Sequence, residues 1–267
     1  MTGLLATADA AVSLFGDRSV GLVILGIAAV AAGIINAIAG GGSFLILPIL
    51  TALGLPPGVA NGTLRVGVLP QCAAIVATFW RQGVTVPPVT WMLAIPMCVG
   101  ALGGSTAAAH LDDALLEPIF GVVFLAWALW LALRPSKFLS PGPEPRKPGI
   151  GAVLASLAIG VYGGFMQAGV GFPLLALWIG HLHYDAVRAN AIKAASSFAF
   201  TLVSLLVFAS AGKIVWLEAM VLTAGSVVGG WMGARLQVKA GPGIVRWGVM
   251  IMVAVSGIFM LIRSLSG

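Results

Sequence analysis

Eight long apolar runs constrain this chain more than any other part of its sequence. A helix needs about 20 apolar residues to cross the hydrocarbon core of a bilayer, with a range of about 17–25. Only 8% of the residues are charged, whereas a soluble domain carries about 25%. The chain is therefore expected to be an all-α, polytopic membrane protein with about eight transmembrane helices. The runs cover residues 20–39, 64–80, 87–109, 115–133, 149–168, 190–211, 215–234 and 244–262.

Two further apolar runs are too short to span a bilayer, and each follows a glycine-rich stretch. They are SFLILPILTALG (43–54) and GFPLLALWIG (171–180). Glycine permits a sharp backbone turn, and irregular backbone at membrane depth occurs only where protein or a watery cavity surrounds it. We therefore expect two half-helices whose N-terminal N–H groups form an anion site. The alternative is that these glycines only allow helices to cross closely.

The two halves of the chain resemble each other. AGGGSFLILP (39–48) resembles AGVGFPLL (168–175), and VANGTLR (59–65) resembles VRANAIK (187–193), with an offset near 126–129 residues. This similarity predicts an internal duplication, as in many secondary transporters. The expected organisation is an N-terminal segment (1–19), a first transmembrane repeat (20–133), a linker (134–148) and a second transmembrane repeat (149–267).

The linker is rich in proline and basic residues, and the positive-inside tendency places it in the cytoplasm. The repeats run parallel if the half-helices do not complete a crossing, and they are inverted if they do. Either arrangement leaves eight basic residues inside and three outside. Charge distribution therefore leaves both the repeat orientation and the side of the N-terminus open.

Two basic residues fall within apolar runs, away from any carboxylate that could neutralise them. Arg65 lies in the first repeat and Lys193 at nearly the matching place in the second, and each follows an asparagine, Asn61 or Asn190. A cation at a helix centre costs about 2.5–3.5 kcal/mol on insertion scales. We hypothesise that the counter-charge is a bound anion, gripped by Arg65 through two parallel hydrogen bonds and attracted by Lys193 as a point charge. The alternative is that both side chains snorkel to the interface, because each lies near a helix start.

Polar side chains near these motifs complete the predicted site. Ser43, Thr63, Gln71, Gln167, Ser196 and Ser197 are candidates, and Thr63 and Gln167 are favoured because they adjoin the repeated motifs. Any one of them can instead hydrogen-bond between helices. The predicted substrate-binding residues are Gly41, Gly42, Ser43, Phe44, Asn61, Thr63, Arg65, Gln167, Gly169, Gly171, Phe172, Asn190 and Lys193.

Other kinds of site find little support in the sequence. Cys72 and Cys98 lie in separate apolar runs and His181 and His183 form a lone H-x-H pair, so neither a metal site nor a cofactor is expected. An intramembrane enzyme would need a nucleophile with a base, or a metal cluster, and no histidine lies inside a span. The net charge of +6 arises mostly at the ends of apolar runs, which favours topology signals and anionic lipid over nucleic acid.

AGGGSFLILPILTALGLPPGVANGT (39–63) is similar to the first-repeat signature of the TauE/SafE family, also called the toluenesulfonate uptake permease family. That signature is a glycine-rich turn, a short helix containing Leu and Pro, and a G-L-P-x-x-x-A-x-G-T stretch. GGFMQAGVGFPLLAL (163–177) is similar to the family's second glycine motif, although Gly169-Val170-Gly171 replaces three glycines. ANAIKA also replaces a G-T-S-like stretch. The resemblance implies transport of sulfur-containing anions such as sulfite, sulfoacetate or aryl sulfonates.

The sequence therefore predicts a multi-pass protein of the cell inner membrane that acts as a secondary carrier for a small organosulfonate or sulfite anion. The anion is expected to bind mid-membrane between the repeats. The expected partners are this anion and the lipid bilayer. An anion channel, or a carrier of another small organic anion, remains the alternative.

Overall fold

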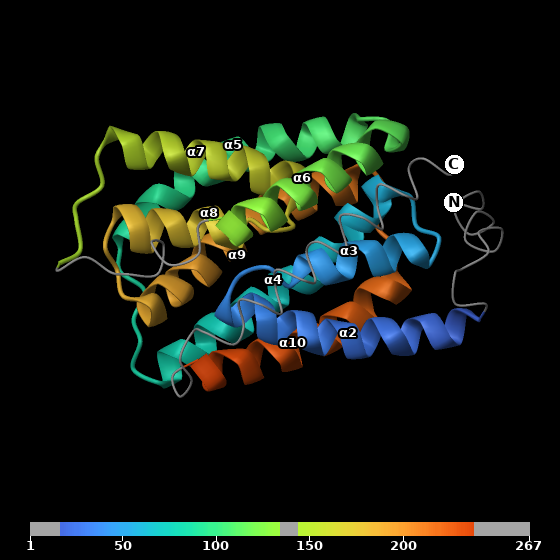
Figure 1. Ribbon diagram of the computed structural model, residues 1–267, viewed down its shortest axis with the longest axis horizontal. Coiled ribbons are helices and arrows are strands. Elements are labelled where there is room, and N and C mark those ends of the chain that lie inside the picture. Colours follow the sequence, from blue (N-terminus) through green and yellow to red (C-terminus); the bar gives the residue numbers. More distant parts are fainter. Residues whose placement is uncertain (1–16, 134–143, 238–267) are drawn as a thin grey trace.

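The computed structural model describes residues 17–133 and 144–237, and within these ranges the chain is helical without strands (Figure 1). This confirms the predicted all-α class for the described ranges. The elements are α2 (Arg18–Ile38), α3 (Ser43–Ala52), α4 (Pro57–Arg81), α5 (Val89–His110), α6 (Asp113–Leu133), α7 (Ile150–Met166), α8 (Gly171–Leu175), the π-helix η1 (Ala176–His181), α9 (Ala186–Ser210) and α10 (Trp216–Gln237).

Six of the described helices are long and apolar enough to cross a membrane: α2, α4, α5, α6, α9 and α10. The chain is therefore a multi-pass membrane protein. Helix α7 has 17 residues and is shorter than these six. The predicted span at 244–262 lies outside the described residues, as do residues 1–16 and most of the linker. The total of eight spans thus stays a prediction.

Two helices end at glycine-containing turns, and a short apolar helix follows each turn. Helix α2 ends at Ile38, and Gly40 then takes a positive φ of 85°. Helix α7 ends at Met166, and Gly169 takes a φ of 77°. L-residues with a Cβ are disfavoured in this region of backbone space, so glycine is the natural choice at both turns. The two short helices expected from the sequence are present as α3 and as α8 with η1.

The helices pack as two groups, each drawn from both halves of the chain. Helix α10 lies along α2 and α4, with α3 beside them, and forms the first group. Helix α5 lies along α7 and α9, with α8 and η1 beside them, and forms the second group. The two groups meet where α4 contacts α9. Figure 1 shows α2 and α10 side by side on one side of the molecule, with α5 and α7 on the other.

Glycines allow these helices to approach closely. A Cβ built on Gly33 of α2 would lie 2.8 Å from the Cα of Gly229 in α10. A Cβ on Gly100 of α5 would lie 2.2 Å from the carbonyl oxygen of Leu157 in α7. Small residues at helix crossings are the usual means of packing in a membrane, where the hydrophobic effect does not drive helices together.

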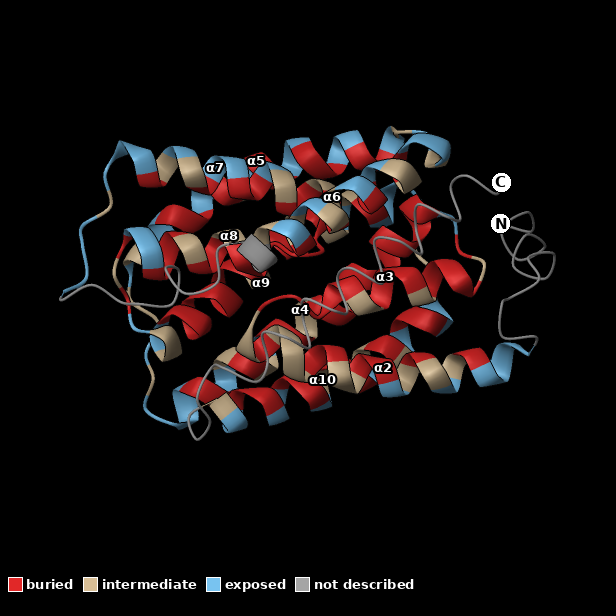
Figure 2. Cartoon of the chain, in the orientation of Figure 1, coloured by how far each residue is buried: buried red, intermediate tan, exposed pale blue. Residues whose placement is uncertain are grey.

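Buried residues line the interior between the two groups, whereas exposed residues lie on the outer faces (Figure 2). Several outer residues are large and apolar, for example Ile27, Leu206 and Met220, which are 64–68% exposed. An outer face of this kind suits contact with lipid. The polar residues that the interior encloses, including Arg65 and Lys193, are therefore shielded from both lipid and water.

Candidate functional site

The two glycine turns meet each other between the helix groups. A Cβ on Gly40 would lie 2.6 Å from the Cα of Gly171, and a Cβ on Gly171 would lie 2.4 Å from the Cα of Gly40. The rings of Phe44 and Phe172, which follow the turns, stack with centroids 6.0 Å apart. The backbone of one turn thus rests directly on the other, and the first turns of α3 and α8 are brought together.

The second turn contains a strained residue that is not glycine. Gln167 has φ 62° and ψ −44°, a conformation that costs a residue with a Cβ about 1–3 kcal/mol. Its side chain is held at both ends, because Oε1 accepts from Arg65 Nη1 at 2.9 Å and Nε2 donates to Thr201 Oγ1 at 3.0 Å. Strain of this kind persists only where surrounding contacts fix it, and it is concentrated at functional sites.

Arg65 is fully buried, and its guanidinium binds the carbonyl end of α7. Nη1 donates to the carbonyl oxygen of Gly163 at 3.0 Å, and Nη2 donates to that of Gly164 at 2.6 Å. Nη2 also donates to Asn61 Oδ1 at 3.3 Å, and the ring of Phe208 lies 4.7 Å from the guanidinium carbon. The last carbonyls of a helix carry partial negative charge. They supply much of the counter-charge that the sequence hypothesis assigned to an anion.

Lys193 is also buried, with 3% of its surface exposed, and it binds the carbonyl end of α2. Its Nζ donates to the carbonyl oxygens of Asn36 at 2.7 Å and Ala37 at 3.3 Å, and to the side-chain oxygen of Asn190. Both cations are buried and donate to helix carbonyls, and neither extends to the protein surface, so the snorkelling alternative is wrong for both. Asn61 and Asn190 play the same part, since each lies one helical turn before a cation and accepts a hydrogen bond from it.

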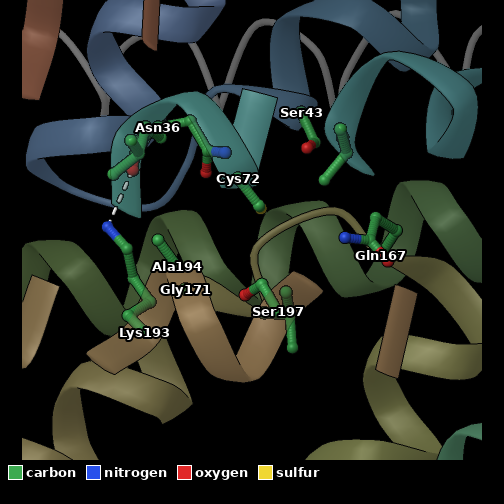
Figure 3. A pocket seen from close by; sticks show the side chains of 11 residues that line it. Asn36, Ser43, Cys72, Gln167, Gly171, Lys193, Ala194 and Ser197 are labelled. Carbon is green, nitrogen blue, oxygen red and sulfur yellow. Dashed lines mark hydrogen bonds between the residues drawn. The ribbon is translucent and has the colours of Figure 1, made fainter. Parts of the chain in front are cut away.

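A narrow cavity lies beside Lys193, at the junction of the two turns (Figure 3). It holds about 10 Å³ of free volume, close to the 10–15 Å³ that one water molecule requires. No carboxylate is among the described residues that line it. The lining residues are Asn36, Ser43, Val68, Cys72, Ile75, Gln167, Val170, Gly171, Lys193, Ala194 and Ser197.

Two serine hydroxyls in this cavity are unpaired, as are those of the buried Ser156 and Ser196, among the residues that the structure describes. Ser43 and Ser197 are 7% and 6% exposed, and neither hydroxyl has a hydrogen-bond partner within residues 17–133 and 144–237. A buried serine in a helix usually bonds the carbonyl four residues earlier. Ser105 and Ser204 do so at 2.6 Å and 3.0 Å. The hydroxyls of Ser43 and Ser197 are instead available to a group in the cavity.

A second small cavity adjoins the first and shares Asn36, Ser43 and Val68 with it. Gln71 also lines it, and the Oε1 of Gln71 accepts from Asn36 Nδ2 at 3.1 Å. Ser226 of α10 closes its far side and donates to the carbonyl oxygen of Gly67 at 3.1 Å. Polar side chains therefore continue from α9 across α2 and α3 to α10.

Short helices that follow glycine turns inside a polytopic membrane protein are typical of transporters. A family model described as "Sulfite exporter TauE/SafE" matches residues 25–260 of the chain. The chain belongs to the TauE/SafE family. The curated relatives of the chain are described as probable membrane transporters, which is consistent with this family.

Three curated relatives of this TauE/SafE protein cover most of its length. A "Probable membrane transporter protein" of Haemophilus influenzae is 28% identical over 83% of this chain and 87% of the relative. "Probable membrane transporter protein YfcA" of Escherichia coli K12 is 27% identical over 94% of each chain. "Probable membrane transporter protein ORF9" of Sinorhizobium sp is 24% identical over 84% of this chain and 86% of the relative. The chain is thus a membrane transporter of this family.

The structure brings most of the predicted binding residues of this TauE/SafE protein to one region, but in different roles. Ser43, Gln167, Gly171 and Lys193 line the first cavity and Gly42 the second. The other predicted residues either form the glycine turns and the first turns of the helices that follow them, or contact the two cations. They are Gly41, Phe44, Asn61, Arg65, Gly169, Phe172 and Asn190.

Thr63 lies apart from both cavities. Its Oγ1 accepts a hydrogen bond from the backbone N–H of Val215 at 3.0 Å, in the connection between α9 and α10. Among the other polar candidates, Ser197 lines the first cavity and Gln71 the second. Ser196 is buried on another face of α9, and its hydroxyl is unpaired within the described residues.

Sequence reasoning missed Asn36 and Cys72, which both line the first cavity. Asn36 is a polar residue in the last turn of the helix before the first glycine turn, where a free carbonyl end is expected. Cys72 lies seven residues after Arg65, which is close to two helical turns. Once the glycine turns had been recognised, helical spacing could therefore have identified both Asn36 and Cys72 as candidates.

Proposed function

We propose that this TauE/SafE protein is a secondary carrier for a small sulfur-containing anion, sulfite or an organosulfonate, that binds beside Lys193 in the cavity at the glycine turns. The observation that carries the proposal is that a buried ammonium, that of Lys193, lines the same cavity as two buried hydroxyls, those of Ser43 and Ser197, which have no partner among the described residues. The described residues that line the cavity include no carboxylate that would repel a bound anion.

An oxyanion would find three kinds of donor in this cavity. The ammonium of Lys193 supplies charge, and its longest contact, 3.3 Å to the carbonyl oxygen of Ala37, is the one that an anion would most easily replace. The hydroxyls of Ser43 and Ser197 supply hydrogen bonds. The first turn of α3 adds the N–H of Ser43 and the positive end of a helix dipole. The N–H groups of Phe44 and Leu45 already donate to the carbonyls of Gly41 and Gly42. Hydrogen bonds to a charged group are worth about 1.5–3 kcal/mol each.

In this proposal Arg65 acts through Gln167 and does not grip the anion itself. Both Nη atoms of Arg65 already donate to protein oxygens. Arg65 fixes the carbonyl end of α7 and the strained Gln167, whose side chain lines the cavity. Its contribution to anion binding is therefore one of positioning, while Lys193 provides the direct contact.

The small size of the cavity favours a carrier over a channel. Free volume for about one water molecule is too small for an anion to pass through this cavity as the described residues enclose it. Passage would then require the group of α2, α4 and α10 to move against the group of α5, α7 and α9. Such movement around a central site is the usual mechanism of carriers built from internal repeats. The proposal includes that internal duplication, and a location in the cell inner membrane.

Binding can be tested by thermal shift on the purified protein with sulfite, sulfate, taurine, sulfoacetate and toluenesulfonate. A specific ligand raises the melting temperature by mass action. We expect the preferred anion to stabilise the wild type and to lose its effect in Lys193→Gln. The matched control is Lys213→Gln, because Lys213 pairs with Asp113 at 3.7 Å, away from the cavity, and this variant should keep the shift. An equal shift in Lys193→Gln would reject the site.

Transport can then be tested in liposomes. A carrier should show anion flux that saturates with concentration, together with counter-transport of labelled anion. Flux that rises linearly without counter-transport would instead support a channel.

A further inference from the structure

The carbonyl ends of α2 and α7, the two helices that precede the glycine turns, are the feature from which this inference starts. The last carbonyls of a helix lack partners within the helix and carry partial negative charge. In carriers with broken helices, half-helix carbonyl ends commonly coordinate a coupling Na⁺ or H⁺. The comparable ends in this chain belong to the two helices that precede the glycine turns: Ile38 of α2, which is itself long enough to span, and Met166 of α7. The question is which positive charge each end receives.

At both ends the positive charge belongs to a side chain. Three oxygens surround the ammonium of Lys193: the carbonyls of Asn36 and Ala37 and the side chain of Asn190. Four oxygens surround the guanidinium of Arg65: the carbonyls of Gly163 and Gly164 and the side chains of Asn61 and Gln167. Each set combines helix-end carbonyls with amide oxygens, which are the oxygen ligands that an alkali cation would use.

Lys193 also occupies the place that a coupling cation must take to affect an anion. Its Nζ touches the end of α2 on one side, and the side chain lines the cavity on the other (Figure 3). A cation in that position links the helix end to a bound anion. Because Lys193 is covalently part of α9, its ammonium occupies the carbonyl end of α2 at every concentration of external ions. No entropy of association has to be overcome.

We propose that Lys193 and Arg65 are resident cations that take the place of a coupling alkali ion, so that this protein binds its anion without Na⁺. The part of this inference that concerns the anion rests on the proposed function. The part that concerns the two helix ends does not, since it follows from the contacts of the two side chains. The two parts therefore need separate measurements.

The first measurement uses the wild-type protein. The apparent affinity for the stabilising anion is compared in NaCl and in choline chloride at equal ionic strength. We expect values that agree within about twofold, whereas coupling to Na⁺ would appear as a tenfold or greater change. A tenfold gain in NaCl would overturn the inference. If no anion shifts the melting temperature in either salt, the proposed function fails, and the second measurement still tests the helix ends.

The second measurement removes one resident cation and tries to replace it. Lys193→Ala leaves the carbonyl end of α2 without its cation and opens space beside it. We expect a lower melting temperature that rises with ammonium chloride or NaCl but not with choline chloride, since a small cation can enter the vacated oxygens. The wild type and Lys213→Ala should show no such dependence on the cation.

Lys193→Ser replaces Lys193→Ala if the alanine variant cannot be purified, because serine leaves similar space. A Lys193 variant that is as stable as the wild type, or that gains nothing from small cations beyond the effect of choline, would overturn the inference. The wild-type comparison of salts needs no variant and decides the anion-linked part even if both substitutions prevent folding.

Discussion

Arg65 on α4 and Lys193 on α9 make matching contacts: each donates to the carbonyl end of the helix that precedes a glycine turn in the opposite half of the chain. Arg65 reaches Gly163 and Gly164 at the end of α7, and Lys193 reaches Asn36 and Ala37 at the end of α2. Two buried cations are thus tolerated without a carboxylate, because helix ends provide their counter-charge.

Arg65→Gln should destabilise the fold. The substitution removes the donor to the carbonyl of Gly164, whereas the carbonyl of Gly163 keeps the backbone N–H of Gln167. A buried polar group left unpaired typically costs about 1–3 kcal/mol. Arg65→Lys should restore little, because an ammonium cannot reproduce the planar fork of the guanidinium. Chemical denaturation in detergent measures both variants. Arg81→Gln, at the exposed end of α4, is the control, and an Arg65→Gln protein as stable as that control would contradict the prediction.

Ser43→Ala and Ser197→Ala should weaken anion binding while leaving stability nearly unchanged. Each variant removes one hydroxyl that has no protein partner in the described ranges, and a hydrogen bond to a charged group is worth about 1.5–3 kcal/mol. The dissociation constant should therefore rise by roughly 10- to 100-fold. Calorimetric titration of the preferred anion provides the measurement.

Ser204→Ala is the matched control for these serine variants. Ser204 lies on α9 like Ser197, is buried, and bonds the carbonyl of Phe200 at 3.0 Å outside the cavity. Its dissociation constant should equal that of the wild type. Serine variants at 43 and 197 that bind as tightly as the Ser204 control would show that the hydroxyls serve no anion.

Gly171→Ala should prevent the two glycine turns from meeting. A new Cβ would lie 2.4 Å from the Cα of Gly40, and that contact is backbone, which cannot rotate away. We expect loss of the folded protein, seen as poor recovery and early aggregation in size-exclusion chromatography. Gly103→Ala, on the exposed face of α5 with nothing within 4 Å of the new Cβ, should behave as the wild type. Equal recovery of both variants would show that the turns can separate.

Thr63→Val should change stability and leave binding unaltered. Thr63 Oγ1 accepts from the N–H of Val215, so the variant loses one hydrogen bond, worth about 1 kcal/mol. Its anion affinity, measured by the same calorimetric titration, should match that of the wild type. A clear loss of affinity with unchanged stability would return Thr63 to the binding site that sequence reasoning assigned to it.

Local sequence patterns predicted the features that depend on nearby residues. The apolar runs located the six described helices that are long enough to span a membrane. The glycine stretches before residues 43 and 171 located the short helices, because backbone turns depend on local residue types. Arg65 and Lys193 were also singled out from the sequence, because placing a cation within an apolar helix costs free energy unless a partner compensates it. These inferences needed no knowledge of tertiary contacts.

Tertiary contacts decided what the sequence left open. Nothing near Arg65 in sequence indicates that the end of α7 lies against it, so its partner was taken to be an anion. Thr63 adjoins a repeated motif, yet its hydroxyl faces the connection before α10. Asn36 was missed because its role depends on Lys193, 157 residues away. Helix packing across the two halves of the chain determines each of these contacts.

The most direct test is to locate an anion in the protein by anomalous scattering. Selenite resembles sulfite in shape and charge, and selenium marks its position in a crystal. The account predicts a selenium peak between Lys193, Ser43 and Ser197, with an oxygen of the anion about 2.7–3.2 Å from Nζ of Lys193. A peak elsewhere in the protein, with this cavity still closed around its own side chains, would contradict it.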